Sequence, residues 1–253
     1  MVDYSFVPGN ISLVQERIQK AAMRSGRDLS QISLLAVAKF HPAEAVIAAY
    51  SSGIRRFGEN RVQEAAAKYL PETMNLMTGA EVDMIGTLQG NKVNKALAIF
   101  DSIQSVDSLD LLKAIVLRTK RREKKLKLYL ELHTGEESKS GFSSVDGILK
   151  AIDSYMEALG GSKTGSQDAL ETEKSASMIE LAGLMTMAPF TGDENLVHAS
   201  FQSLRKALEE IRKHFGLPGF RELSMGMSGD FEIAIEEGST LLRIGTAIFG
   251  TRQ

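Results

Sequence analysis

The sequence predicts one β/α barrel with eight parallel strands, and three observations indicate this fold. Short apolar runs alternate along the chain with longer stretches of helical period, as in successive βα units. Eight of these runs have the length and composition of buried strands. The length of 253 residues is usual for a single barrel of this kind. A doubly wound open sheet is the structural alternative.

The apolar runs locate the strands, and apolar positions repeated every three or four residues locate the helices. The expected strands are residues 32–37, 54–57, 81–85, 102–106, 127–132, 179–186, 222–224 and 240–244. The expected helices are residues 11–25, 42–52, 61–69, 92–98, 109–122, 145–159, 196–215 and 231–237. Asn10 is expected to cap the first helix, which would close the ring of helices.

Residues 160–177 interrupt the alternation of strands and helices. This segment is rich in glycine and serine and almost without apolar residues, so we expect a flexible surface insertion. It leads from a helix into a strand and should therefore lie at the barrel face opposite the active mouth. Residues 1–253 are otherwise expected to form a single domain.

Composition limits the function classes that the chain can belong to. The formal charge of −2 shows no broad basic footprint for nucleic acid or an anionic membrane surface. The chain has no cysteine, which removes disulfides and thiol chemistry, and its four histidines show no metal-binding spacing. The start of the sequence lacks a secretory signal pattern, and no apolar run is long enough to span a membrane. We expect a soluble cytoplasmic protein without a metal site.

Residues just past the strand ends point into the site of a β/α barrel, and Lys39 is the first of them. A lysine amine enclosed at such a place can have a lowered pKa and attack an aldehyde to form an imine. A solvated lysine at a strand end is the alternative interpretation of this position.

The last two predicted strand ends carry small and hydroxyl-bearing residues. The loop 223–230 brings Ser228 to the mouth after the seventh strand, and Gly245 and Thr246 follow the eighth strand. These two loops are the usual phosphate site of the fold, because backbone N–H groups converge there. Ordinary turn chemistry is the alternative explanation.

The same segments carry a resemblance to a known family. The matching motifs are residues 36–39, 57–64, 85–92, 135–142, 183–187, 223–230 and 243–250. In these segments the chain resembles the pyridoxal phosphate homeostasis protein family, whose fold is that of the N-terminal barrel of bacterial alanine racemase. The resemblance implies pyridoxal 5′-phosphate as the cofactor, with Lys39 carrying the imine and Ser228, Gly245 and Thr246 holding the phosphate. It also implies that Arg243 faces the pyridine nitrogen.

Two further residues complete the expected cofactor site, and two others depart from the family pattern. Asn60, after the second strand, and Met225, in the loop after the seventh, are placed among the cofactor-binding residues. Thr87 stands where many relatives have histidine, and His133 replaces a common asparagine or similar polar residue. These departures affect the wall of the site and not cofactor binding.

The expected function is to hold the cofactor rather than to use it. Arginine has only donors, so a pyridine nitrogen beside Arg243 would stay unprotonated and serve poorly as an electron sink. None of the five tyrosines is expected just past a strand end, and no second domain is expected to supply an acid–base group. We therefore expect a monomeric, non-catalytic protein that buffers pyridoxal phosphate or delivers it to apo enzymes. An amino-acid racemase and a Schiff-base aldolase are the alternatives.

Overall fold

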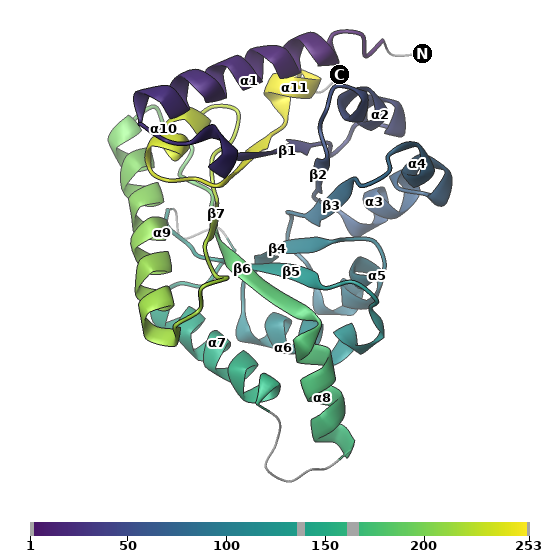
Figure 1. Ribbon diagram of the computed structural model, residues 1–253, viewed down its shortest axis with the longest axis vertical. Coiled ribbons are helices and arrows are strands. Elements are labelled where there is room, and N and C mark those ends of the chain that lie inside the picture. The colour runs from purple at the N-terminus through teal and green to yellow at the C-terminus, as the bar shows by residue number, and fades with distance from the viewer. Residues whose placement is uncertain (1–2, 136–139, 161–166, 252–253) are drawn as a thin grey trace.

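The computed structural model describes residues 3–135, 140–160 and 167–251, and these residues form a closed barrel. Eight strands run in the order β1 to β8, each parallel to its neighbours, and β8 pairs with β1 to close the ring (Figure 1). The strands are β1 (Ser33–Val37), β2 (Arg56–Glu59), β3 (Glu81–Met84), β4 (Ser102–Val106), β5 (Leu126–Glu131), β6 (Ile179–Met185), β7 (Glu222–Ser224) and β8 (Leu241–Ile244). The predicted barrel is therefore confirmed, and the open sheet is excluded.

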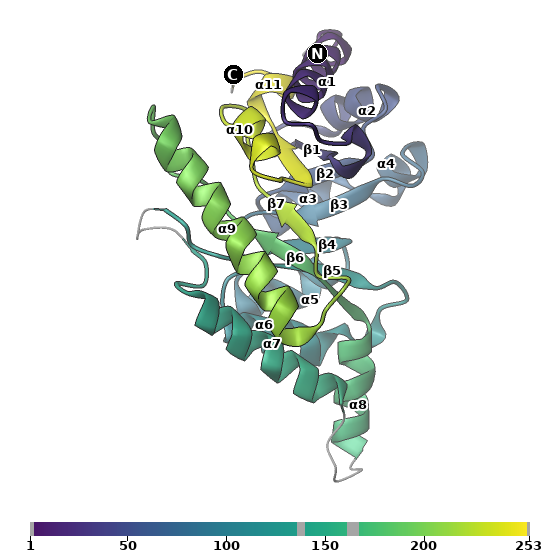
Figure 2. The ribbon, with the colours of Figure 1, turned by 60° about the vertical axis from the view of Figure 1, so that its left-hand side comes forward.

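Helices surround the barrel and cover the outer face of its strands (Figures 1 and 2). They are α1 (Val7–Arg24), α2 (Ala43–Ser51), α3 (Val62–Lys68), α4 (Pro71–Leu76), α5 (Val93–Leu97), α6 (Leu109–Arg118), α7 (Val145–Leu159), α8 (Gln167–Ser177), α9 (Glu194–Phe215), α10 (Phe231–Glu236) and α11 (Thr246–Phe249). Short 3₁₀ turns lie at Leu29–Gln31, Gly90–Lys92 and Thr119–Arg121. Helix α1 packs against α10, α11 and α2, so the opening helix closes the ring between the two ends of the chain.

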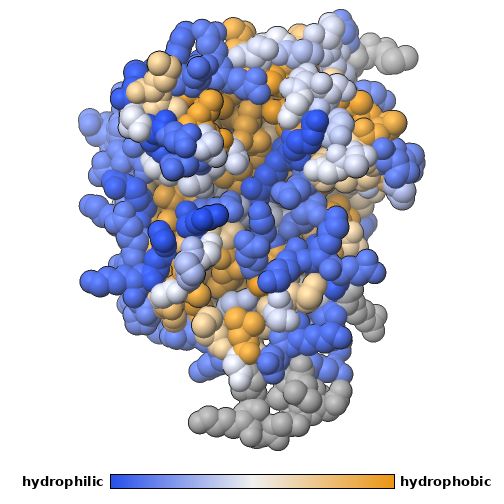
Figure 3. Space-filling model, viewed as in Figure 1, coloured by the Kyte–Doolittle hydropathy of each residue, from blue (hydrophilic) through white to orange (hydrophobic). Residues whose placement is uncertain are grey.

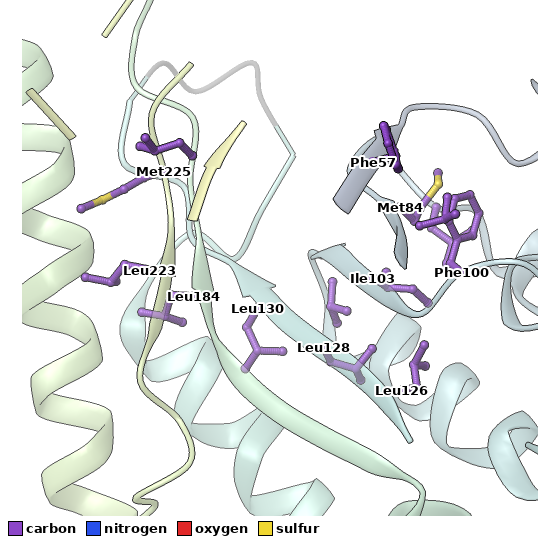
Figure 4. Close-up of a cluster of buried hydrophobic side chains, with 14 of the residues drawn as sticks. Phe57, Met84, Phe100, Ile103, Leu126, Leu128, Leu130, Leu184, Leu223 and Met225 are labelled. Atoms are coloured by element: carbon purple, nitrogen blue, oxygen red, sulfur yellow. The ribbon is translucent and has the colours of Figure 1, made fainter. Parts of the chain in front are cut away.

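Alternate strand residues divide the core into an outer and an inner part. Side chains such as Leu128, Leu130 and Leu184 point toward the helices and join the large outer core, part of which Figure 4 shows. Leu35, Val37, Tyr129, Ala182, Met185 and Leu241 form a separate cluster from β1, β5, β6 and β8. Because strand side chains alternate between the two faces, this second cluster marks the interior of the barrel.

A polar network fills the interior between the N-terminal ends of the strands and the mouth. Arg56 bonds to Asp83 Oδ2 (Nε, 2.9 Å) and to the Tyr129 hydroxyl (2.9 Å). Gln104 Nε2 donates to the same Asp83 oxygen at 2.5 Å, and Ser224 Oγ donates to Gln104 Oε1 at 2.6 Å. The network therefore links the strands across the barrel.

Three differences between the structure and the sequence prediction have a clear physical reason. Helix α1 begins at Val7, so Asn10 lies inside it, where its side-chain amide donates to Ile248 O at 3.0 Å and does not cap the helix. Helix α4 was not expected, and it begins at Pro71, a favourable first residue of a helix.

The third difference concerns the expected flexible insertion at 160–177, where residues 167–177 form helix α8. Its end packs into the protein: Ser175 and Ala176 are buried, and the Tyr155 hydroxyl bonds to Ala176 O at 3.2 Å. These contacts explain a helix in so polar a segment. Residues 161–166 lie outside the described part of the chain. Helix α8 leads into the N-terminal end of β6, the side of the barrel where this segment was expected.

Polar side chains cover most of the outside of the molecule. In the view of Figure 3 they dominate the surface, and apolar residues show in patches between them. Among the described helices, none is long and apolar enough to cross a membrane.

Candidate functional site

Lys39 lies at the C-terminal mouth of the barrel, two residues beyond the inward-facing Val37. Side chains alternate between the two faces of β1, and those of Leu35 and Val37 point into the barrel interior. Lys39 lies two residues further along the chain, at a position with the same alternation. The residue is half-buried. Strand geometry therefore places residue 39 at the C-terminal end of the barrel, where the sequence analysis expected it.

Asn60 and Thr87 lie at the neighbouring strand ends and line one cavity. This cavity of about 450 Å³ is also lined by Phe40, Gln89 and Lys92. Gly86 packs against the backbone of Asn60 so closely that a Cβ at position 86 would lie 2.3 Å from Asn60 O. A side chain there would displace Asn60, which explains the glycine.

Arg243 points into the barrel from β8 and is only 4% exposed. One terminal nitrogen donates to Ser224 O and to Ser224 Oγ, each at 2.7 Å, and the other donates to Thr186 O at 2.7 Å. These bonds use three of the five N–H donors of a guanidinium, so others remain for a ligand. Burial lowers the pKa of Arg243 to about 10, although the nearby charges of Asp230 and Glu131 raise it. The side chain therefore stays positive at neutral pH.

The loops after β7 and β8 meet at the mouth. Ser228 Oγ accepts a hydrogen bond from the backbone N–H of Ala247 at 3.3 Å, which joins the two loops. Thr246 is exposed and begins α11, where the first backbone N–H groups lack partners within the helix. Gly245 lies between β8 and α11. The structure thus brings Ser228, Gly245 and Thr246 together as a group of hydroxyl and amide donors.

Gly226 sets the course of the β7 loop. Its φ of +97° favours glycine, and an added Cβ would lie 2.6 Å from Ala234 Cβ. The Arg243 amide donates to Gly226 O at 2.9 Å. The loop therefore follows this path because position 226 has no side chain.

Met225 is the predicted site residue that the structure does not bring to the mouth. It is fully buried and belongs to the outer core, among the side chains drawn in Figure 4. Its backbone N–H donates to Leu241 O, and its carbonyl oxygen accepts from Ser239 Oγ. Residues alternate on a strand, so Ser224 faces inward and Met225 faces the helices. The Met225 side chain is therefore part of the core in this structure, and its expected place in the cofactor site stays a prediction that concerns its backbone.

Glu131 is a candidate site residue that the sequence analysis missed. It ends β5 and is 2% exposed, and Ser140 Oγ donates to its Oε1 at 3.3 Å. Burial raises its pKa to about 7, while the charge of Arg243 opposes that rise and Asp107 adds to it. The expected strand 127–132 extends one residue beyond Glu131, whereas β5 ends at Glu131, so this residue was not among those expected past a strand end. His133 also follows β5, and its backbone N–H donates to Phe142 O.

A second, larger cavity lies at the opposite end of the barrel. It has a volume of about 1280 Å³ and is lined by residues near the N-terminal ends of the strands, including Arg56, Lys127, Arg221 and Glu222. Basic and acidic groups are mixed there, and the cavity is on the far side of the polar network from Lys39. Sites in β/α barrels lie at the C-terminal face, so the mouth at Lys39 is the candidate functional site.

The chain is similar in sequence to known proteins. A family model for the alanine racemase N-terminal domain matches residues 14–253. The pyridoxal phosphate homeostasis protein of Pseudomonas aeruginosa is 36% identical over 249 residues, covering 98% of this chain and 96% of that protein. The human protein of the same name is 37% identical, covering 94% of this chain and 84% of its own length.

Solved structures agree with the sequence relatives. PipY of Synechococcus elongatus, solved with pyridoxal phosphate (PLP) bound, matches with a TM-score of 0.75 and 31% identity, covering 93% of this chain and 99% of PipY. Alanine racemase of Corynebacterium glutamicum matches with a TM-score of 0.66 and 16% identity, covering 99% of this chain and 62% of the racemase. The racemase likeness shows the fold alone. The relatives named above, matched over nearly the whole chain, show that it belongs to the pyridoxal phosphate homeostasis protein family.

Proposed function

We propose that this chain binds pyridoxal 5′-phosphate through an imine with Lys39 and takes part in pyridoxal phosphate homeostasis. The observation that carries the proposal is the half-buried Lys39 at a mouth where Ser228, Thr246 and Arg243 also gather. With pyridoxal phosphate bound, the Lys39 amine would condense with its aldehyde to give the imine, with release of one water molecule.

The donor set fits a phosphorylated pyridine aldehyde. The hydroxyls of Ser228 and Thr246 and the backbone N–H of Thr246, the first residue of α11, can donate to phosphate oxygens. Remaining donors of Arg243 can bond to a pyridine nitrogen, and Asn60 lines the wall of the mouth. The group contains an amine, hydroxyls and a guanidinium, which suits an anionic aldehyde.

The proposed role is to hold the cofactor and not to catalyse a reaction. Arg243 stays protonated and so can only donate, which leaves a pyridine nitrogen beside it unprotonated and the ring a weak electron sink. Tyr129 lies in the polar network on the far side of Arg243, where its hydroxyl bonds to Glu222. The names of the relatives as homeostasis proteins also support this role.

The same proposal extends to what the chain does with the cofactor, to its oligomeric state and to its location. A protein that holds pyridoxal phosphate without using it can buffer the free cofactor or deliver it to apo enzymes that depend on it. We propose that the chain does so as a monomer in the cytoplasm. The cytoplasmic location fits a chain without cysteine, because such a protein needs no oxidising compartment to form disulfides.

The experiment that tests the proposal is reduction of the loaded protein with borohydride. We expect a visible chromophore that reduction removes, and one pyridoxyl group on the tryptic peptide that contains Lys39. Lys39→Ala should bind no cofactor covalently. A label on another lysine, or a chromophore that persists in Lys39→Ala, would contradict the proposal.

Glu131 favours a second candidate, a racemase-type enzyme. A buried carboxyl group with a pKa near 7 can exchange protons at neutral pH, as a general acid or base does. The test is incubation of the loaded protein with L- and D-amino acids, followed by chiral chromatography. Sustained interconversion at about 1 per second or faster, lost in Glu131→Gln, would establish the enzyme.

A further inference from the structure

A buried ion pair lies directly behind the mouth of the barrel. Lys68, at the end of α3, has its Nζ 2.6 Å from Glu59 Oε1, and the two side chains are 7% and 0% exposed. The Tyr69 hydroxyl donates to the same Glu59 oxygen at 3.0 Å. Glu59 Oε2 has no partner among the described residues. Buried charges are costly to desolvate, so the fold retains this pair at a cost in stability.

The Lys68 ammonium makes a second bond that the ion pair alone does not require. Its Nζ donates to the backbone carbonyl of Ala38 at 2.7 Å. Ala38 is the residue immediately before Lys39. The same carbonyl accepts the amide N–H of His41 at 3.1 Å, so it closes the turn that contains Lys39.

The backbone of this turn is strained. Phe40 has a φ of +66° and is the only residue other than glycine with a positive φ in the described chain. An aromatic residue rarely adopts this conformation, and it persists only where surrounding contacts hold it. The charged bond to Ala38 O is such a contact, because bonds from an ammonium group are stronger than neutral ones.

The ion pair also reaches the second strand end of the site. Glu59 is the last residue of β2 and directly precedes Asn60. The Ala38 amide donates to Gly58 O at 3.0 Å, and the Ile85 amide donates to Glu59 O at 2.9 Å. The pair thus anchors the chain at Ala38, just past the end of β1, and at Glu59, the last residue of β2, and these two residues directly precede Lys39 and Asn60.

We propose that Lys68 is a positioning residue for Lys39: its bond to the Ala38 carbonyl holds the strained turn that aims the Lys39 amine into the mouth. This inference rests on the proposed function, since it concerns covalent attachment of pyridoxal phosphate at Lys39. Lys68 does not contact the cofactor, and Glu59 holds the Lys68 ammonium in place.

A purely structural role for the ion pair makes a different prediction. If the pair only stabilised the fold, every loss of a bond in it would lower the melting temperature and leave attachment at Lys39 unchanged. Tyr69→Phe separates the two roles, because it removes a bond to Glu59 and keeps the bond from Lys68 to Ala38.

The experiment compares Lys68→Met with Tyr69→Phe and the wild-type protein, well below their melting temperatures. Stopped-flow absorbance gives the limiting rate of attachment at saturating pyridoxal phosphate. We expect this rate to fall by about 10-fold or more in Lys68→Met, the loss of one charged hydrogen bond, and to stay within about twofold in Tyr69→Phe. In the unloaded protein, hydrogen exchange at the His41 amide should be faster in Lys68→Met alone.

A second variant covers the case in which Lys68→Met does not fold. Glu59→Gln combined with Lys68→Met leaves no uncompensated buried charge, yet still lacks the donor to Ala38 O, so it should show the same slow attachment. Attachment at the wild-type rate in Lys68→Met or in the double variant would overturn this inference and leave the proposed function standing. An equal loss of attachment rate in Tyr69→Phe would do the same. If the wild-type protein does not attach the cofactor at Lys39, the proposed function fails and this inference fails with it.

Discussion

Replacing Glu131 by glutamine should change the way in which stability depends on pH. Burial raises the pKa of this carboxyl group from 4.5 to about 7 in the folded chain. Below pH 4.5 both states are protonated, and above it only the unfolded chain releases its proton. Stability therefore falls as the pH rises from 4.5 to about 7, by about 3 kcal/mol in total. Glutamine cannot ionise, so Glu131→Gln should escape this loss.

The assay is urea unfolding of the unloaded wild-type and Glu131→Gln proteins at several pH values. The difference between their free energies of unfolding should shift in favour of the variant by roughly 2–3 kcal/mol between pH 5 and pH 8. Glu157→Gln, at an exposed position of α7, is the matched control for the loss of one carboxyl group. Parallel curves for the wild type and Glu131→Gln over this range would refute the assignment of a buried, protonated carboxyl group.

Three further predictions follow from the site and the barrel. Ser228→Ala or Thr246→Val should weaken pyridoxal phosphate binding by about 10- to 100-fold and leave binding of unphosphorylated pyridoxal unchanged, as titration with both ligands would measure. Arg56→Met should destabilise the fold by about 3–5 kcal/mol in chemical unfolding, because the buried Asp83 would lose the guanidinium with which it forms an ion pair. Replacing residues 167–177 by a glycine–serine linker should lower the Tm by roughly 5–10 °C but keep cofactor affinity, since α8 lies away from the mouth.

The barrel could be predicted from the sequence because its strands are buried on both faces. Parallel strands in such a position form short apolar runs, and glycine or polar residues mark where each run ends. The places of Lys39 and Asn60 in the barrel follow in the same way, since each lies a few residues past an expected strand. Position along a strand needs no knowledge of distant contacts, so the location of these two residues could be predicted, while their role in binding stays a prediction.

The features that the sequence did not reveal depend on contacts across the fold. Lys68 is a lysine at the end of a short helix, and only the tertiary structure brings its Nζ to the Ala38 carbonyl. Met225 seemed to belong to a site loop, but the alternation of β7 turns it to the outer core. Helix α8 has a polar composition, and its contacts with α6 and α7 account for its folding. Tertiary packing overrides local pattern at each of these positions.

The interior of this barrel contains a network of buried polar side chains, and this network extends to Arg243 at the site. Arg243 is held by Ser224, which is bonded in turn to Gln104 and through it to Asp83 and Arg56. A guanidinium fixed in this way cannot turn to follow a ligand, so a ring that binds against it must adopt one orientation. The Ala38 carbonyl, just past the neighbouring strand β1, is held by Lys68 of α3. Two independent sets of buried polar contacts thus hold the backbone and side chains at two adjacent strand ends of the mouth, and fixed groups lose little entropy when a cofactor binds.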